Sequence, residues 1–537
     1  MTKMVNVYIM IACFLTLLAA RVVSMPSPNP EINLRGERLP PTPPLSRNLF
    51  KNLFPARSTF HPANDPAPPY STPPKIEGDD TKPLKVLFLS ADTGGGHRAS
   101  SESLASQFLL QHPNTVYTLY DIWTDDGCYP YNCLVPSYKF MSSRPRIWRF
   151  LYHLSNSAPY CAFMNLHSQV TSKRRIRKRI AEYDPDVIVS VHPTMTNVPQ
   201  KCVIDIKKET GKDIPIFTVV TDLGSGHATW FTRRMEKIFV ASSRMSKLAR
   251  VRGWVSRSKL VECGLPIRKQ FGEKKAAMGK RGSEPGKEYQ RFMRQGLKIK
   301  NTEDPVILVM GGGEGVGSLG EIVEDTVAEM QRTGTNGTVA VVCGRNEQLR
   351  SQLSSRDWDA SPAKLTPSTS RRTRKRDMIK RVFKRRRLDT ASSPVPPTPP
   401  PSHVDVIPMA FVSNMDEWMA AASVLVTKAG PGTIAEAAAM GLPVLLTSFL
   451  PGQEAGNVDV VLEGGFGDYV SDPVGIARTV VEWVNDENMM TTMAKNAESV
   501  GAPDAAKSIV EVVLERALEA RKLNGGKSAA DFGKKKV

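Results

Sequence analysis

The sequence predicts an α/β protein with two doubly wound, Rossmann-like domains that face one cleft. Short apolar runs alternate with helical stretches in two separate parts of the chain, which indicates parallel sheets with helical crossovers. Two of these runs lead directly into glycine clusters, DTGGGHRAS at residues 92–100 and MGGGEGVG at residues 310–317. In a strand, glycine loop and helix unit, free N–H groups at the helix N-terminus favour a phosphate. Each domain therefore presents one candidate phosphate-binding loop.

The first domain is expected over residues 84–268. Its short, β-rich runs bounded by turn residues are typical of buried parallel strands. The predicted strands are 85–90, 116–120, 187–192, 216–221, 237–241 and 259–263. Residues 269–300 are charged and glycine-rich, and we expect them to be a linker.

The second domain is expected over residues 301–525. Its predicted strands are 306–310, 339–343, 404–408, 424–427 and 444–447. Residues 354–402 interrupt it with a basic, proline-rich stretch that lacks apolar periodicity, which predicts a disordered surface insertion. The tail at 526–537 is expected to be loose. In such sheets ligands bind beyond the carboxyl ends of the strands, the edge at which both glycine clusters lie.

The N-terminus has features of a targeting segment. Residues 5–20 are apolar but too few for a comfortable membrane span, so residues 1–24 are interpreted as signal-like, with a permanent anchor as the alternative. Residues 25–83 are rich in proline and serine and contain few acidic residues, which fits a disordered linker or a transit segment.

Charge and cysteine content exclude some classes of protein and leave others open. The formal net charge is +19, yet residues 371–387 alone hold eleven Lys and Arg against one Asp. That run could attach the chain to nucleic acid or to a membrane, so a polybasic binding protein is the alternative from another class. The seven cysteines are scattered and include no CxxC pair, which indicates neither a disulfide framework nor a zinc site.

His97 is the first candidate catalytic residue. It follows the glycines of DTGGGHRAS in what should be the first helical turn, where the helix dipole disfavours an imidazolium. A neutral imidazole there could accept a proton as a general base. The alternative is a packed or capping histidine. The cluster is not GxGxxG, which argues against a dinucleotide-binding oxidoreductase.

A second candidate site is TKAGPGTIAEAAAMGLP at residues 427–443. Lys428 ends a strand, Gly430 and Gly432 form a tight loop, and Thr433 is expected to cap the next helix. Glu436 lies three residues further on, at capping-box spacing. Its carboxylate could serve only the helix, or it could accept hydrogen bonds from ribose hydroxyls while the loop N–H groups bind a diphosphate.

Two further motifs contain polar groups with two interpretations each. In PGQEAGN at residues 451–457, the side chains of Gln453, Glu454 and Asn457 suit sugar hydroxyls, although a plain turn would also accept them. Asp184 and Asp186 form a D-x-D sequence, but they precede a predicted strand. That places them at the wrong edge for a metal–diphosphate site, and we interpret them as a loop.

These motifs, together with TDLGSGHATWF (221–231), GLPIR (264–268) and CGRN (343–346), resemble the monogalactosyldiacylglycerol synthases. This family is the plastid-type relative of the bacterial lipid II glycosyltransferase, in glycosyltransferase family 28. The resemblance runs from about residue 84 to about residue 520 and covers seven motifs in order. It implies a GT-B fold whose first domain takes a lipid acceptor and whose second takes UDP-galactose. It also implies inverting transfer to 1,2-diacylglycerol with no metal or other cofactor.

The resemblance assigns roles residue by residue. His97 looks like the family's histidine that deprotonates the acceptor, and Asp222 and His227 match its T-D-x-x-x-x-H segment, where Asp222 could instead fix a turn. Glu436 corresponds to the ribose carboxylate. The remaining donor-binding candidates are Gly94, Gly95, Gly96, Gly311, Gly312, Gly313, Gly315, Lys428, Gly430, Gly432, Thr433, Gln453, Glu454 and Asn457. The chain departs from the family at Ala228, where a proline is usual, and in its basic insertion.

Residues 129–167 combine aromatic side chains with Lys and Arg. Alone, this pattern favours an aromatic core with a solvated basic edge; with the resemblance, it favours docking on anionic membrane lipids. The expected partners are therefore UDP-galactose, diacylglycerol and anionic lipids, without specific nucleic acid. A sterol or polyprenyl acceptor, or UDP-glucose or UDP-GlcNAc as donor, remains an alternative. The expected location is the plastid envelope membrane, with the endoplasmic reticulum as the competing compartment.

Overall fold

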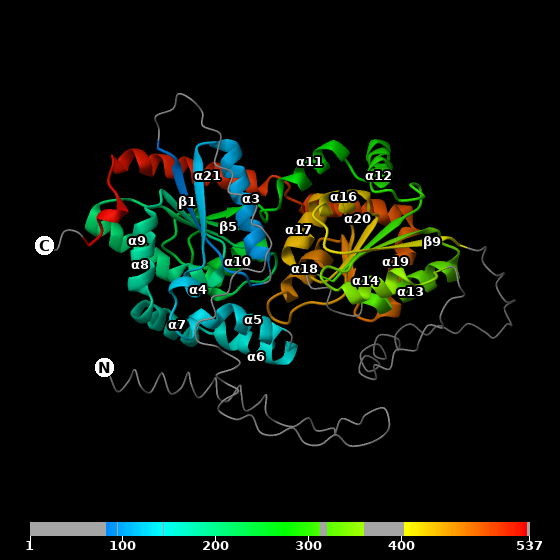
Figure 1. Ribbon diagram of the computed structural model, residues 1–537, viewed down its shortest axis with the longest axis horizontal. Coiled ribbons are helices and arrows are strands. Elements are labelled where there is room, and N and C mark those ends of the chain that lie inside the picture. The colour runs from blue at the N-terminus through cyan, green and yellow to red at the C-terminus, as the bar shows by residue number, and fades with distance from the viewer. Residues whose placement is uncertain (1–81, 94, 143, 312–318, 359–401, 534–537) are drawn as a thin grey trace, which may run out of the picture. The chain divides into compact units, whose positions relative to one another are not determined.

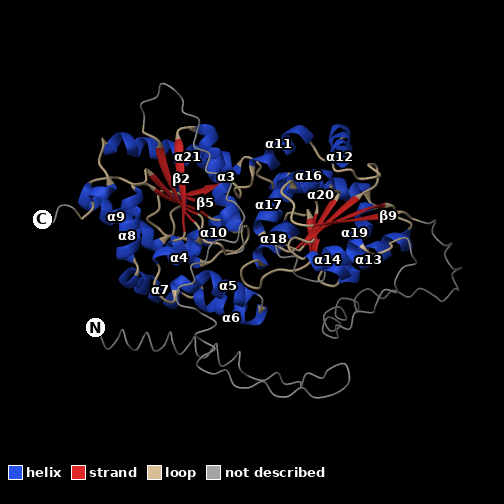
Figure 2. Cartoon of the chain, in the orientation of Figure 1, coloured by secondary structure: helices blue, strands red, loops and turns tan. Residues whose placement is uncertain are grey.

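The first half of the molecule is built on a parallel six-stranded sheet. The computed structural model describes residues 82–93, 95–142, 144–311, 319–358 and 402–533. Within them the first sheet has the order β2-β1-β3-β4-β5-β6, with every neighbouring pair parallel (Figures 1 and 2). Its strands are β1 (Leu84–Leu89), β2 (Thr115–Tyr120), β3 (Val187–Ser190), β4 (Ile216–Val219), β5 (Ile238–Val240) and β6 (Leu260–Glu262).

The second half repeats this architecture. Its sheet has the order β12-β11-β10-β7-β8-β9, again with parallel neighbours. Its strands are β7 (Val306–Met310), β8 (Gly337–Val342), β9 (Val404–Met409), β10 (Val424–Thr427), β11 (Val444–Leu446) and β12 (Gly467–Tyr469). The predicted strands are all present within a few residues. Only β12 was missed, because the edge strand Gly-Asp-Tyr has no apolar run.

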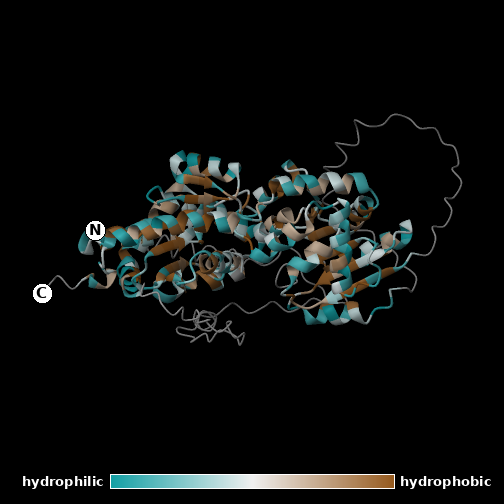
Figure 3. Cartoon of the chain, turned by 90° about the horizontal axis from the view of Figure 1, so that it is seen from above, coloured by the Kyte–Doolittle hydropathy of each residue, from teal (hydrophilic) through white to brown (hydrophobic). Residues whose placement is uncertain are grey.

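Helices cover both faces of each sheet. In the first half they are α3 (Gly96–Gln111), α4 (Ile122–Asp126), α5 (Leu134–Ser142), α6 (Pro145–Ser155), α7 (Ala158–Thr171), α8 (Lys173–Tyr183), α9 (Asn197–Thr210) and α10 (Ser243–Gly253). Alternate residues of β1 enter opposite cores: Leu87 and Leu89 on one face, Val86 and Phe88 on the other. The strands are therefore apolar on both sides, as Figure 3 shows by their brown colour.

The second half and its connections contain the remaining long helices. They are α11 (Lys269–Met278), α12 (Glu284–Gly296), α13 (Leu319–Thr333), α14 (Glu347–Ser354), α16 (Met415–Ala421), α17 (Pro431–Ala439), α18 (Ala455–Glu463), α19 (Pro473–Val484), α20 (Glu487–Val500) and α21 (Ala505–Asn524).

Residues 269–300 are not the linker that their charge and glycine content predicted. They form α11 and α12, and two buried arginines from this segment fix it to the second half. Arg281 donates to the carbonyls of Met419 and Met440 at 2.8 and 2.9 Å, and Arg294 donates to the Ala421 carbonyl at 2.9 Å. These carbonyls lie at the C-terminal ends of α16 and α17, where no intrahelical donor remains. The arginines are thus structural caps.

The C-terminal boundary also differs from the expectation. Helix α21 packs Ile509, Val510 and Val513 into the core beside β1 and β3, so it belongs to the first half although it follows the second in sequence. The tail predicted to be loose is docked as well, because the fully buried Ala529 donates its N–H to Asp184 at 2.7 Å. An apolar helical face packs wherever a sheet is uncovered, and sequence position does not reveal which sheet that is.

The D-x-D sequence has a structural explanation at the amino end of β3. Asp184 also pairs with Lys212 at 2.7 Å, and Asp186 accepts the N–H of Lys85 at 2.9 Å. The interpretation as a loop is confirmed. Residues 1–81 of the predicted targeting and linker segments (1–83), and residues 359–401 of the basic insertion, lie outside the described residues. Among those described, no helix is both long and apolar enough to span a membrane.

Candidate active site between the two sheets

The first glycine cluster places His97 at the carboxyl edge of β1. Gly95 is the N-cap of α3 and has φ = 79°, a left-handed conformation that glycine adopts without strain. Gly96 begins the helix and His97 is its second residue. Gly94 lies outside the described residues. The left-handed turn explains why the chain needs glycine at position 95, two residues before this histidine.

The hydrogen bonds of His97 determine its tautomer. Nδ1 lies 2.8 Å from the Val191 carbonyl and 2.8 Å from Oγ1 of Thr221. Because a carbonyl only accepts, Nδ1 carries the ring proton, and Nε2 keeps a lone pair. Burial lowers the pKa of His97 to about 4, so the ring is neutral at physiological pH. The neutral imidazole expected from the sequence is therefore present, with burial as its main cause.

Two buried rings lie near that of His97, His192 and Trp230, and the Trp230 centroid is 6.1 Å away. His192 lies edge-on at 4.7 Å between ring centroids, and its Nε2 is 3.1 Å from the hydroxyl of Thr93 in the glycine loop. Asp222 accepts the indole N–H of Trp230 at 2.7 Å. Burial raises the pKa of Asp222 to about 7, and the charge of Glu454 adds to this shift.

His227 differs from His97 in its contacts. Nδ1 accepts the backbone N–H of Thr229 at 3.3 Å, so Nε2 carries the proton and faces the Ser155 hydroxyl at 3.1 Å. Both ring nitrogens thus have protein partners. Burial lowers the pKa of His227 to about 4. These contacts join the TDLGSGH loop to α6.

In the second half, Lys428 and Glu454 form one pair at the carboxyl edge of the sheet. Lys428 Nζ lies 3.2 Å from Glu454 Oε1, and Glu454 Oε2 accepts the N–H of Leu450 at 2.7 Å. Gly311 directly follows β7, whereas Gly312, Gly313 and Gly315 lie outside the described residues. The structure therefore describes only the beginning of the second glycine loop.

Helix α17 begins three residues earlier than the sequence predicted. Gly430 is its N-cap and Pro431 its first residue, so Gly432 and Thr433 are helical and Thr433 makes no cap. Proline is favoured at the first position because its missing N–H leaves no donor unpaired there. The capping-box interpretation of Thr433 and Glu436 is therefore wrong.

Glu436 instead contacts the first half of the molecule. Its Oε1 accepts from Nε of Arg268 at 3.1 Å and lies 3.0 Å from the Nη2 of that residue. Burial raises the pKa of Glu436, and Arg268 opposes this shift. This ion pair joins GLPIR to TKAGPGTIAEA across the two halves.

Loops from both halves meet directly at the TDLGSGH and PGQEAGN motifs. The side chain of Asn457 is 1% exposed; it accepts the N–H of Gly224 at 3.0 Å and donates to the Ala429 carbonyl at 2.9 Å. The Ser225 hydroxyl donates to the Gln453 carbonyl. A Cβ on Gly456 would lie 2.4 Å from the Gly224 carbonyl carbon, so this contact requires glycine. In this arrangement Asn457 connects the two halves.

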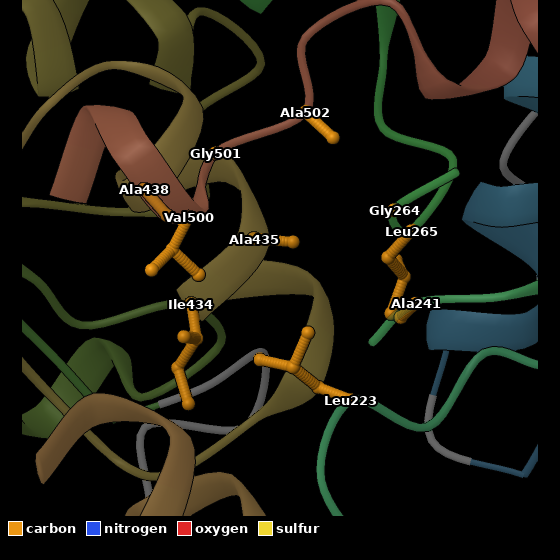
Figure 4. A pocket seen from close by; sticks show the side chains of 10 residues that line it. All are labelled: Leu223, Ala241, Gly264, Leu265, Ile434, Ala435, Ala438, Val500, Gly501 and Ala502. Atoms are coloured by element: carbon orange, nitrogen blue, oxygen red, sulfur yellow. The ribbon is translucent and has the colours of Figure 1, made fainter. Parts of the chain in front are cut away.

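An apolar cavity of about 20 Å³ adjoins this contact. Figure 4 shows Leu223, Ala241 and Leu265 from the first half opposite Ile434 and Ala435 from α17. Its volume corresponds to about one water molecule, far too little for a nucleotide. We therefore regard it as packing space between the halves.

Sequence reasoning missed three residues of this region. Thr221 contacts His97, His192 packs on it, and Arg268 pairs with Glu436. Thr221 and Arg268 lie within motifs whose residues had not all been given roles. His192 follows β3 at the same sheet edge as His97, which is the pattern that could have identified it.

Known proteins are similar to this chain over most of its length. The sequence profile described as Monogalactosyldiacylglycerol (MGDG) synthase matches residues 97–267, and the Glycosyltransferase family 28 C-terminal domain profile matches residues 401–509. "Monogalactosyldiacylglycerol synthase 1, chloroplastic" of Arabidopsis thaliana is 31% identical over 454 residues, covering 82% of this chain and 72% of the relative. The chain belongs to the monogalactosyldiacylglycerol synthase family.

A second relative has a similar identity and covers a similar share of the chain. "Probable monogalactosyldiacylglycerol synthase 2, chloroplastic" of Oryza sativa subsp. indica is 33% identical, with 79% of each chain covered. The GT-B arrangement of two facing Rossmann-like halves is confirmed. Among solved structures, Acinetobacter baumannii MurG is 11% identical with a TM-score of 0.47, covering 81% of this chain and 100% of that one.

Proposed function

We propose that this protein transfers galactose from UDP-galactose to the free hydroxyl of 1,2-diacylglycerol and forms monogalactosyldiacylglycerol with inversion. The observation that carries the proposal is His97, a neutral histidine whose proton is fixed on Nδ1 at the edge of the sheet. Membership of the family supports the donor and acceptor, because curated relatives are named for this product. A family member needs a sugar nucleotide and a lipid acceptor, and the two halves divide these tasks.

Proton transfer is assigned to the first half. Nε2 of His97 accepts the proton of the acceptor hydroxyl while that oxygen attacks the anomeric carbon. The bond between this carbon and the diphosphate oxygen breaks at the same time, and UDP leaves with the electron pair. Val191 and Thr221 hold the imidazole in orientation. Asp222 and His227 are assigned supporting roles, since Trp230 donates to one oxygen of Asp222, and Thr229 and Ser155 contact the two ring nitrogens of His227.

Donor binding is assigned to the second half. Glu436 accepts hydrogen bonds from the ribose hydroxyls through Oε2, because Arg268 contacts Oε1. Lys428 and the main-chain N–H groups of the two glycine loops stabilise the charge that grows on UDP. Gln453 and Glu454 face the sugar. This proposal includes no metal or other cofactor, and we expect EDTA to leave the activity unchanged.

Membrane docking is assigned to α5, α6 and α7, which lie together in the first half (Figure 1). Exposed apolar side chains accompany exposed arginines on these helices, a composition that suits an anionic lipid surface. The apolar members are Phe140, Phe150, Leu166 and Val170, and the arginines are Arg144, Arg146 and Arg149. The chloroplastic relatives support a plastid location, which a fluorescent fusion of residues 1–85 would test.

The test is a transfer assay with purified protein and vesicles that contain diacylglycerol. We expect UDP release from UDP-galactose and a new galactolipid by mass spectrometry. Vesicles without diacylglycerol provide the control. Parallel reactions with UDP-glucose and UDP-GlcNAc, and with sterol or polyprenyl acceptors, separate this function from its close alternatives. No product with any donor and acceptor pair would refute the proposal.

A further inference from the structure

Helix α6 has one face toward solvent and another toward the contact between the two halves of the molecule. Arg146, Arg149, Phe150 and His153 follow one another at helical spacing, and all four are exposed, with Phe150 64% exposed. On the opposite face Tyr152 is only 8% exposed. The face proposed to meet lipid and the face that packs inside therefore belong to one short, rigid element.

The inner face of α6 lies against the loop proposed to bind the donor sugar. The ring of Tyr152 covers Gly452, and a Cβ on that glycine would be 2.7 Å from Cδ1 of the tyrosine. Gly452 has φ = 88°, so both its conformation and this contact favour glycine. The next residues are Gln453 and Glu454. A displacement of α6 would therefore move this loop or leave it unsupported.

The same helix is anchored to the loop that follows β4. Ser155 contacts His227 at 3.1 Å, and the Asn156 side chain accepts the backbone N–H of Ala228 at 2.8 Å. Both contacts fix the C-terminal end of α6 to this loop.

Helix α5 reaches the same region. Tyr138 packs edge-on against Trp148 of α6 at 5.1 Å between ring centroids. Burial raises the pKa of Tyr138 to about 12, with the charges of Glu454 and Asp222 adding to the shift and a hydrogen bond with Gln453 opposing it. The phenol of Tyr138 therefore lies beside the polar groups of both halves.

We propose that Tyr152 is a positioning residue that couples docking of α6 on a lipid surface to binding of the nucleotide donor by the loop at Gly452. The inference rests on the proposed function. A lipid surface that orders α5 and α6 stabilises the loop through Tyr152, so UDP binds more tightly. Because coupling between two binding sites is reciprocal, bound UDP must strengthen attachment to lipid by the same factor.

The experiment measures the Kd of UDP by calorimetry with and without vesicles of phosphatidylcholine and phosphatidylglycerol that lack diacylglycerol. For the unmodified full-length protein we expect vesicles to lower this Kd at least about fivefold, the lower end of typical coupling. Saturating UDP should strengthen vesicle binding to the same degree. Equal Kd values in both conditions would overturn the inference, whereas failure to bind UDP in either condition would refute the proposed function.

Variants locate the coupling. Tyr152→Ala should still bind vesicles and UDP, but the ratio of the two Kd values should fall below about twofold. Tyr152→Phe keeps the ring over Gly452 and should restore the ratio. Phe150→Ala, on the outer face of the same helix, should weaken vesicle binding and leave the lipid-free Kd unchanged. If Tyr152→Ala kept the wild-type ratio of the two Kd values, Tyr152 would not carry the coupling. If that variant does not fold, the wild-type Kd values with and without vesicles still decide whether the coupling exists.

Discussion

The two faces of the candidate site, one on each half, differ in the surroundings of their ionisable side chains. On the first half, burial favours neutral forms: it lowers the pKa of His97 to about 4 and raises that of Asp222 to about 7. On the second half, charged groups are retained in pairs, Lys428 with Glu454 and Glu436 with Arg268 of the opposite half. Burial acts on both faces, but on the second it is opposed by a cation beside each carboxylate.

This difference matches the two tasks of a glycosyl transfer. A general base must be uncharged before it accepts a proton, and a desolvated imidazole meets this requirement at neutral pH. A diphosphate carries negative charge throughout, and it is best held by cations and by fixed N–H dipoles. The following predictions test this division of tasks.

The largest expected effect is on the neutral face. His97→Ala should lower kcat about 10²- to 10⁴-fold, the usual range for a general base, with little change in the KM for UDP-galactose. Steady-state kinetics on diacylglycerol vesicles measures both quantities. His227→Gln is the matched control, because a glutamine can accept from Thr229 and donate to Ser155. An equal loss of kcat in this variant would give His227 a catalytic role.

The pH profile sharpens this assignment. Since the pKa of His97 is lowered to about 4, its protonation should not reduce kcat/KM as pH falls from about 8 to about 5. An unperturbed histidine would produce a decline near its ordinary value of about 6.5. A decline in wild type that disappears in Asp222→Asn but persists in His97→Ala would point to Asp222.

Asp222→Asn should change the pH dependence of stability. The folded-state pKa of Asp222 is about 7, above its ordinary value of 3.8. Folding therefore takes up a proton between these values, and the stability of the wild type falls as pH rises through them. The asparagine variant lacks this penalty and should gain up to about 4 kcal/mol relative to wild type between about pH 4 and about pH 8. Thermal unfolding at both pH values measures the gain, and a constant difference would contradict the shift.

Glu436→Ala tests the charged face. The loss of charged hydrogen bonds to ribose should raise the KM for UDP-galactose about 10- to 100-fold, equivalent to about 1.5 to 3 kcal/mol, with a smaller effect on kcat. The stabilisation that saturating UDP adds in a thermal melt should fall by about the same 1.5 to 3 kcal/mol. Glu482→Ala, which removes an exposed carboxylate on α19 outside the candidate site, is the control. If kcat fell and KM did not, Glu436 would belong to the chemical step.

The smallest effect is expected at the outer edge of the contact between the halves. Arg244 of α10 lies 2.6 Å from Asp459 and 3.1 Å from Glu463, but all three side chains are at least 40% exposed. Such pairs contribute less than about 1 kcal/mol. Arg244→Ala should therefore shift the melting temperature by only a few degrees, and added salt should reduce the difference further. A large loss would show that this pair, and not Asn457, joins the halves.

Much of the fold could be predicted because parallel strands are apolar on both faces. The runs at β1, β7 and β10 are visible for this reason, and the glycines after them identify the edge where ligands bind. Strand β12 could not be found, since an edge strand of Gly-Asp-Tyr requires no apolar pattern. Residues 505–524 were placed in the second domain, because nothing local indicates that helix α21 covers the first sheet.

The positions of the site residues could be predicted from the sequence, but their hydrogen-bond and ion-pair partners could not. His97 stood out by its place after the glycines, and its chemistry follows from Val191 and Thr221, which lie far from it in sequence. Arg268 and Asn457 form contacts across the halves, and such long-range pairs leave no periodicity in the chain. Polar residues in a linker-like segment were also misleading, because Arg281 and Arg294 are buried caps.

The return of α21 to the first sheet means that the polypeptide passes between the halves twice, near residues 264–269 and 500–505. These passages run side by side, because a Cβ on Gly264 would lie 2.2 Å from the Cβ of Ala502. A single connecting segment would let the halves rotate about any axis, whereas two adjacent segments restrict their opening to rotation about one axis. Neither half can be isolated by one cut, and a split-protein design must supply α21 together with the N-terminal fragment.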